Sequence, residues 1–256
     1  MSKSRRLDVI AMDTDSTIVF GPTKVAVEGL ATVIRDLEPD VIAIDSPPEW
    51  ALIGKSRPIA LQLARMGIHA FPTPALEHRR PLHGWMEVGF KIFEIAKSTG
   101  YPLYRGDNDR ARCAIEVFPH ASAVVLRGRL PGKGATKKIW RRQTLVDAGV
   151  ETSALSSEDK LDAALAAVTG VRFLQGATCN VGERGQAVLV LPVAHLSARP
   201  YIRDASIPWD GAIEWSPTSD VHQCLCGCGA PVRRRYLPGH DAKHRSQLRR
   251  ALLAST

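Results

Sequence analysis

The sequence lacks any uninterrupted apolar run of about 18 residues, the length that a membrane-spanning helix needs, and its mean hydropathy is −0.09. A short basic start leads directly into a strand-like run, without the apolar core of a secretory signal peptide. We therefore expect a cytoplasmic chain with no membrane partner. Internal repeats and low-complexity tracts are also absent, and 45% hydrophobic with 23% charged residues excludes disordered and fibrous classes.

Cysteine is scarce among the 256 residues and unevenly placed. Five cysteines are an odd number, which argues against a disulfide framework in a chain without a secretory signal. Cys113 and Cys179 are isolated, whereas Cys224, Cys226 and Cys228 fall within five residues. This clustering indicates a metal site.

The cysteine cluster is followed by His240 and His244. Soft thiolates with an imidazole suit a closed structural Zn²⁺ site, so we expect a zinc module with ligands Cys224, Cys226, Cys228 and His240. His244 is the alternative fourth ligand, and free thiols are the alternative to a metal site. A tail of about 35 residues cannot bury a core of its own, so we expect a bound metal to stabilise its fold. The tail resembles small zinc-binding modules at the ends of bacterial and phage proteins.

Basic charge is concentrated in the same tail. Residues 222–256 carry seven Lys or Arg against one acid, so they hold +6 of the net +8 and leave +2 for residues 1–221. This imbalance indicates a polyanionic partner such as nucleic acid. The expected contacts are three arginines and one stacking aromatic, namely Arg233, Arg234, Arg235 and Tyr236. Alternatively, the charge maintains solubility, or the module docks a protein partner.

Hydrophobic patterning predicts an α/β fold. Apolar, β-branched runs predict strands at 7–13, 16–21, 24–29, 40–50, 113–121 and 186–192. Apolar residues at helical spacing predict helices at 29–39, 57–67, 83–100, 139–149 and 156–176. This order is typical of a mixed sheet with helices on its faces. We therefore expect a domain at 1–194, a linker at 195–221 and the zinc module at 222–256.

Five acids stand out on these elements. Asp13 and Asp45 each end an apolar strand run, Glu116 lies on another, and Asp159 and Asp162 share one face of the last helix. Converging carboxylates repel each other, and divalent cations with a preference for oxygen ligands, such as Mg²⁺, relieve that repulsion. The pattern favours a Mg²⁺ or Mn²⁺ site, and two such ions can promote attack of water on a phosphodiester.

Each acid also has an ordinary structural explanation. Asp13 and Asp45 could initiate turns, and Asp159 and Asp162 could be favourable charges at a helix N-terminus. The order of the acids along the chain favours the site over these explanations.

That order resembles the RNase H-like superfamily. More narrowly, a set of segments resembles a domain family of unknown function described as predicted RNase H-like nucleases: IAIDSPPEW at 42–50, IEVFPHAS at 115–122, RRQTLVDAG at 141–149, SSEDKLDAALAAVTG at 156–170 and VLVLP at 188–192. The resemblance covers roughly residues 7–193.

The resemblance implies an RNase H-like mixed sheet flanked by helices, and metal-dependent hydrolysis of phosphodiester bonds. It implies Asp13, Asp45 and Asp162 as metal ligands, Asp159 as the second helical acid, and Glu116 as a catalytic or loop-anchoring residue. Two further first-strand acids, Asp15 and then Asp8, are the alternatives to Asp13.

Four basic residues near the expected cleft have two readings. Lys137, Lys138, Arg141 and Arg142 could contact phosphates or form a solvated helix face.

We expect a metal-dependent nuclease acting on DNA or RNA; the alternative is a non-catalytic scaffold of the same fold that binds nucleic acid or protein. An actin-like phosphotransferase is disfavoured, because Thr14–Ser16 supplies no glycine-rich phosphate loop.

Overall fold

The computed structural model describes residues 6–106, 110–183, 186–203, 222–223 and 231–232. The chain divides into two compact units, Met1–Gly211 and Ala212–Thr256. In the second unit, the described residues form a short antiparallel pair, β7 (His222–Gln223) and β8 (Pro231–Val232).

The first unit begins with an antiparallel hairpin of β1 (Arg6–Met12) and β2 (Ile18–Ala26). The prediction of two separate strands at 16–21 and 24–29 was wrong, because β2 continues through Gly21 and Pro22. These two residues lie opposite one residue of β1 in a register shift, and a bulge of this kind tolerates proline within a strand. Gly21 has φ +81°, and a Cβ there would overlap the Val9 carbonyl.

A four-stranded sheet forms the centre of the unit, in the order β3-β4-β6-β5. Strands β3, β4 and β6 are parallel, and β5 runs antiparallel to β6. The sheet is therefore mixed, as predicted. Strand β4 ends at Glu116 instead of continuing to residue 121, because Pro119 starts a helix, and β5 was not predicted. The bounds are β3 (Val41–Ile44), β4 (Cys113–Glu116), β5 (Cys179–Val181) and β6 (Leu189–Leu191).

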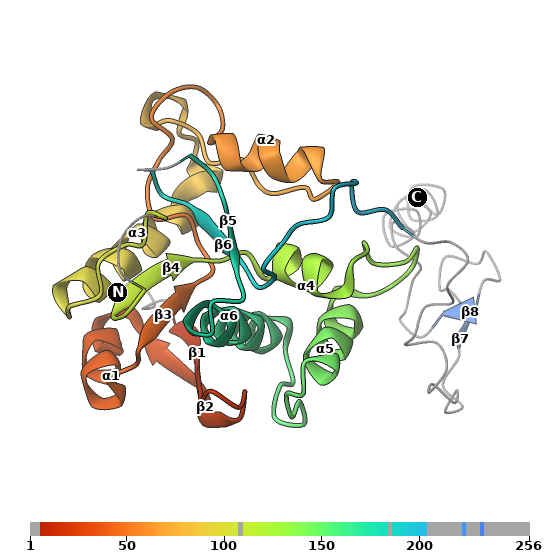
Figure 1. Cartoon of the computed structure of the whole chain (residues 1–256), viewed down its shortest axis with the longest axis horizontal. Helices are drawn as coiled ribbons and strands as arrows, with labels where there is room; N and C mark the ends of the chain where they lie inside the picture. Colours follow the sequence, from red (N-terminus) through yellow and green to blue (C-terminus); the bar gives the residue numbers. More distant parts are fainter. Residues whose placement is uncertain (1–5, 107–109, 184–185, 204–221, 224–230, 233–256) are drawn as a thin grey trace, which may run out of the picture. The chain divides into compact units, whose positions relative to one another are not determined.

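Helices flank this sheet and the hairpin (Figure 1). All five predicted helices are present, and α4 is an additional one. None of the described helices is both long and apolar enough to cross a membrane. The bounds are α1 (Leu30–Leu37), α2 (Pro58–Arg65), α3 (Gly84–Ser98), α4 (Pro119–Arg127), α5 (Lys137–Asp147) and α6 (Glu158–Leu174). Single 3₁₀ turns lie at η1 (Val27–Gly29), η2 (Leu76–His78) and η3 (Pro81–His83).

Helix α6 packs against the hairpin, β3, α4 and α5. Ser157 caps its N-terminus by accepting a hydrogen bond from the Lys160 amide at 3.2 Å, and its apolar residues are buried along most of its length. Gly170 allows close approach to β3, because a Cβ there would lie 3.2 Å from Val41 Cγ1. Helix α6 therefore holds its first turns, and the acids on them, in a fixed position beside the sheet.

The first unit extends beyond residue 194, the expected domain boundary. Tyr201 is buried and donates its backbone N–H to the Met66 carbonyl at 2.9 Å. The Leu130 amide donates to the Ile202 carbonyl at 3.1 Å. Residues 195–203, the described start of the expected linker, therefore pack onto the domain.

Candidate active site

Two of the predicted acids meet beside a buried arginine. Asp45 directly follows β3, and Asp162 lies near the start of α6. Arg141, on α5, places Nε 2.8 Å from Asp162 Oδ1 and Nη1 3.9 Å from Glu158 Oε2. The N–H of Arg141 is not aligned with the carboxylate, so Asp162 Oδ1 is buried with no hydrogen-bond donor. The charge pair therefore leaves this buried carboxylate oxygen without a hydrogen bond.

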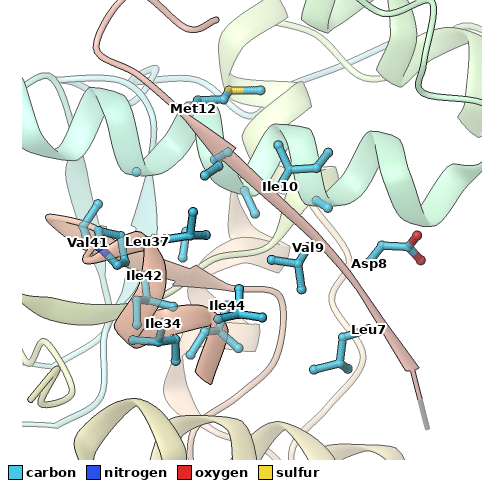
Figure 2. Close-up of a pocket in the computed structure, with 18 of the residues that line it drawn as sticks. Leu7, Asp8, Val9, Ile10, Met12, Ile34, Leu37, Val41, Ile42 and Ile44 are labelled. Atoms are coloured by element: carbon cyan, nitrogen blue, oxygen red, sulfur yellow. The ribbon is translucent and has the colours of Figure 1, made fainter. Parts of the chain in front are cut away.

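The acids line a cavity of about 590 Å³ between the hairpin and β3, next to α1 and α6. Among the described residues, β1 and β3 belong to separate sheets, and side chains of both strands line the space between them (Figure 2). Most of the lining is apolar. The exceptions include six acidic residues, namely Asp8, Glu38, Asp40, Asp45, Asp159 and Asp162.

The pKa values of Asp45 and Asp162 reflect this crowding. Desolvation is the main cause that raises the pKa of Asp45 to about 6 and that of Asp162 to about 7, and repulsion from neighbouring carboxylates adds to it. Arg141 opposes both increases. Asp45 keeps accessible surface because it lines the cavity, although protein atoms surround it closely. Ionising both carboxylates therefore costs free energy in the folded protein, and binding of a proton or a cation reduces that cost.

Asp13 lies elsewhere, in the exposed turn of the hairpin. Its Oδ1 accepts hydrogen bonds from the Asp15 amide at 3.0 Å and the Thr17 amide at 2.9 Å. It neither lines the cavity nor belongs to the charges that shift the pKa values of Asp45 and Asp162. The structure thus shows Asp13 in the turn-forming role that was its structural alternative.

Asp8 is the first-strand acid that reaches the cavity. Its side chain is 5% exposed, its Oδ2 lies 2.7 Å from Lys24 Nζ, and its Oδ1 is buried without a hydrogen-bond partner. The difference arises because β1 ends at Met12, before Asp13. Asp8 lies on the strand and shares a face with Ile10 and Met12, which pack against the core cluster of α6.

Glu116 is brought close to Asp45 but is already paired. Its two oxygens accept hydrogen bonds from Arg57 Nη1 at 2.9 Å and Nη2 at 2.7 Å, and Arg57 also donates to the Ala187 carbonyl at 3.1 Å. Burial raises the pKa of Glu116, and Arg57 opposes that rise. The pair anchors the start of α2 to the sheet, a role that sequence analysis left unassigned for Arg57.

The four basic residues separate into different environments. Arg141 lies in the site, Lys137 and Lys138 are exposed on the first turn of α5, and Arg142 donates to the Thr152 and Leu155 carbonyls at 2.6 Å each. Arg142 therefore holds the loop before α6.

His120 is a further residue near the site that sequence analysis missed. Burial, together with Arg141 and Lys137, lowers the pKa of His120 to about 4. Its imidazole is therefore neutral at pH 7. His120 lies within the IEVFPHAS segment, but that segment alone does not reveal its position near Arg141.

A family model described as Protein of unknown function (DUF429) matches residues 6–185. The chain belongs to this DUF429 family. No curated protein and no solved structure matches it. The DUF429 match contains every acid of the cavity together with Arg57 and Arg141, and it ends before the second unit. The candidate site is therefore a feature of the DUF429 domain.

The donor set of the DUF429 domain suits a hard divalent cation. Among the described residues, no three His, Cys, Asp or Glu side chains are grouped closely enough to hold a metal ion, so the predicted set of Asp13, Asp45 and Asp162 is not assembled. Asp45 and Asp162 nevertheless offer carboxylate oxygens, one of them unsatisfied. Mg²⁺ commonly binds through one or two carboxylates and retains several waters, so this pair fits such an ion.

The predicted features of the tail lie outside the described residues. These are the zinc ligands Cys224, Cys226, Cys228 and His240 with the alternative His244, and the nucleic-acid contacts Arg233, Arg234, Arg235 and Tyr236.

Proposed function

We propose that this chain is a divalent-metal-dependent nuclease that hydrolyses phosphodiester bonds of DNA or RNA. The observation that carries the proposal is the pair Asp45 and Asp162, two crowded carboxylates with raised pKa values beside Arg141. Ionisable groups perturbed in this way concentrate at functional sites. A repelling pair of this kind also weakens the fold, which suits a site that is completed by a cation.

Each residue near the pair has a distinct proposed role. Asp45 and Asp162 would hold Mg²⁺ or Mn²⁺, with Asp159 at the rim. When bound, such an ion would supply activation of a water and stabilisation of the leaving oxygen. Arg141 orients Asp162 and offers its guanidinium to a phosphate oxygen.

An RNase H-like arrangement is part of the proposal. An antiparallel hairpin, a helix, a strand that ends on an acid and a late helix with an acid follow one another in the expected order. The separate hairpin is a departure from a single continuous sheet.

We also propose that the tail binds Zn²⁺ through Cys224, Cys226, Cys228 and His240. Arg233, Arg234, Arg235 and Tyr236 would then add affinity for a polyanion, a contribution that should weaken as salt rises.

A cleavage panel tests the proposed activity. Labelled single- and double-stranded DNA, RNA, an RNA–DNA hybrid and a four-way junction are incubated with Mg²⁺, Mn²⁺ or EDTA. Wild type should cut at least one substrate only with metal, whereas Asp45→Asn and Asp162→Asn should bind without cutting. Asp36→Asn, an exposed acid on α1, is the matched control and should cut normally.

Two results would overturn the proposal. If both Asp45→Asn and Asp162→Asn still cut, the acids are not the active site. If wild type shows salt-sensitive binding without cleavage, the protein is the non-catalytic scaffold. Calorimetric titration with Mn²⁺ provides an independent readout, since wild type and Asp36→Asn should bind the ion more tightly than Asp45→Asn.

A further inference from the structure

A second, smaller pocket opens on the other side of Asp45. Its volume is about 110 Å³, and Asp45, Arg57 and Glu116 line it together with the rings of Phe71 and Trp85. These aromatic side chains come from the long connection between β3 and β4, not from the elements that carry the acids. We call this space the aromatic pocket.

The two rings are unusually accessible. Phe71 is 51% exposed and Trp85 is 40% exposed, although aromatic side chains gain most by burial. Exposed apolar surface next to polar groups marks binding sites. The position of the rings beside Asp45 points to a ligand that also reaches the acids.

The rings are held in place by neighbouring rings. Phe71 meets Trp85 edge-to-face with centroids 6.1 Å apart, and meets His83 in the same way at 5.8 Å. His83 is 7% exposed, and its Nδ1 accepts a hydrogen bond from the Arg80 amide at 2.9 Å. Rings fixed in this manner lose little freedom when a flat ligand stacks on them.

The segment that carries the rings is basic, although the charged groups lining the aromatic pocket itself are Asp45, Glu116 and Arg57. Residues 51–85 contain five Lys or Arg and one acid. Lys55, Arg79 and Arg80 are exposed, and Arg79 forms a surface ion pair with Glu87 at 2.7 Å. Aromatic platforms within a basic surface are the means by which proteins hold single-stranded nucleic acid, because bases stack on the rings while cations follow the backbone.

We propose that Trp85 stacks on an unpaired nucleobase while Phe71, which lies edge-to-face with Trp85, packs against the base edge, so that the substrate is a single-stranded nucleic acid or an unpaired segment. In a duplex, neighbouring bases cover both faces of each base, which leaves no face for the rings. The proposal rests on the proposed nuclease function, which it extends by naming the substrate class. It assigns Phe71 and Trp85 to binding and leaves the chemistry to the acids.

Binding without cleavage tests the stacking directly. The full chain carrying Asp45→Asn is titrated without added Mg²⁺ or Mn²⁺ with a labelled single-stranded DNA 12-mer, the same strand without bases, and a duplex. The 12-mer should bind more tightly than either competitor. Adding Trp85→Ala should weaken 12-mer binding about fivefold to 150-fold and leave binding of the base-free strand unchanged, which separates ring contacts from phosphate contacts, including those of the tail.

Matched variants sharpen the result. Trp85→Phe should restore most of the affinity, and Leu76→Ala, which shortens an exposed side chain in the same segment, should have no effect. Thermal denaturation should show Trp85→Ala folded like its parent. Unchanged 12-mer affinity in Trp85→Ala, equal binding of duplex, or an equal loss in Leu76→Ala would overturn the stacking proposal.

The two proposals can fail separately. Wild type that binds the 12-mer through Trp85 but cuts nothing would refute the nuclease and retain the stacking. Metal-dependent cleavage with no effect of Trp85→Ala on affinity would support the nuclease and refute the stacking.

Discussion

Replacing Asp45 with asparagine should make the protein more stable at neutral and alkaline pH. The substitution keeps the shape of the side chain and removes one charge from a crowded set. In the folded protein the pKa of Asp45 is raised from 3.8 to about 6, so the native state holds a proton more tightly than the unfolded chain. Stability therefore falls as pH rises from about 4 to about 6, and the full penalty is present above that window.

The size of the effect follows from the same pKa. An increase of about two in pKa corresponds to at most about 3 kcal/mol. Asp45 keeps accessible surface in the cavity, and solvent screening reduces this figure to about 1 kcal/mol. For a domain of this size, 1 kcal/mol shifts the melting temperature by about 2–4 °C. Asp45→Asn should thus melt about 2–4 °C higher than wild type at pH 8, with little difference at pH 4.

Circular dichroism melts from pH 4 to pH 8 provide the assay, with Asp36→Asn as the exposed control. Addition of Mg²⁺ or Mn²⁺ at pH 8 should stabilise wild type more than Asp45→Asn, because only wild type retains both carboxylates. A variant that is less stable than wild type at pH 8, or a gain that is the same at every pH, would refute the electrostatic reasoning.

Three further predictions concern other parts of the chain. Arg57→Met should destabilise the fold by about 3–5 kcal/mol in urea denaturation, because Glu116 is left buried and unpaired, and adding Glu116→Leu should recover much of the loss. Gly89→Ala should lower stability by about 1–3 kcal/mol, because the new Cβ would overlap the Ser46 side chain, and Ser46→Gly should relieve the effect. Full-length protein should purify with about one equivalent of zinc by elemental analysis, and Cys226→Ser should lose it.

Much of the fold could be predicted because local patterns and tertiary packing agree. Helix α6 has a serine cap and a long apolar run, and β3 is a short run of apolar residues before Asp45. Helix α4 escaped prediction because six of its nine residues are buried, which blurs the amphipathic period. The continuity of β2 was missed because the bulge at Gly21 and Pro22 looks like a chain break in sequence.

Some residues of the candidate site could also be predicted from the sequence, and others could not. Asp45 and Asp162 could be identified because they follow a strand and share a face with a second acid on a helix, and the structure places both beside the same arginine. Asp13 could not be separated from Asp8 by sequence, because the apolar run continues to Met12 and does not show that the turn begins at Asp13. Arg57 could not be assigned a role, because its partner Glu116 lies 59 residues away in sequence.

The acids and the rings of this protein are carried by separate stretches of chain. Asp45 directly follows β3 and Asp162 lies on α6, whereas Phe71 and Trp85 lie further along the connection between β3 and β4. Because both ends of this connection are tied to parallel neighbouring strands, its interior can diverge among family members while the strand ends keep their places. Chimeras that exchange only residues 51–98 between relatives should therefore transfer ligand preference and leave the chemistry to the recipient.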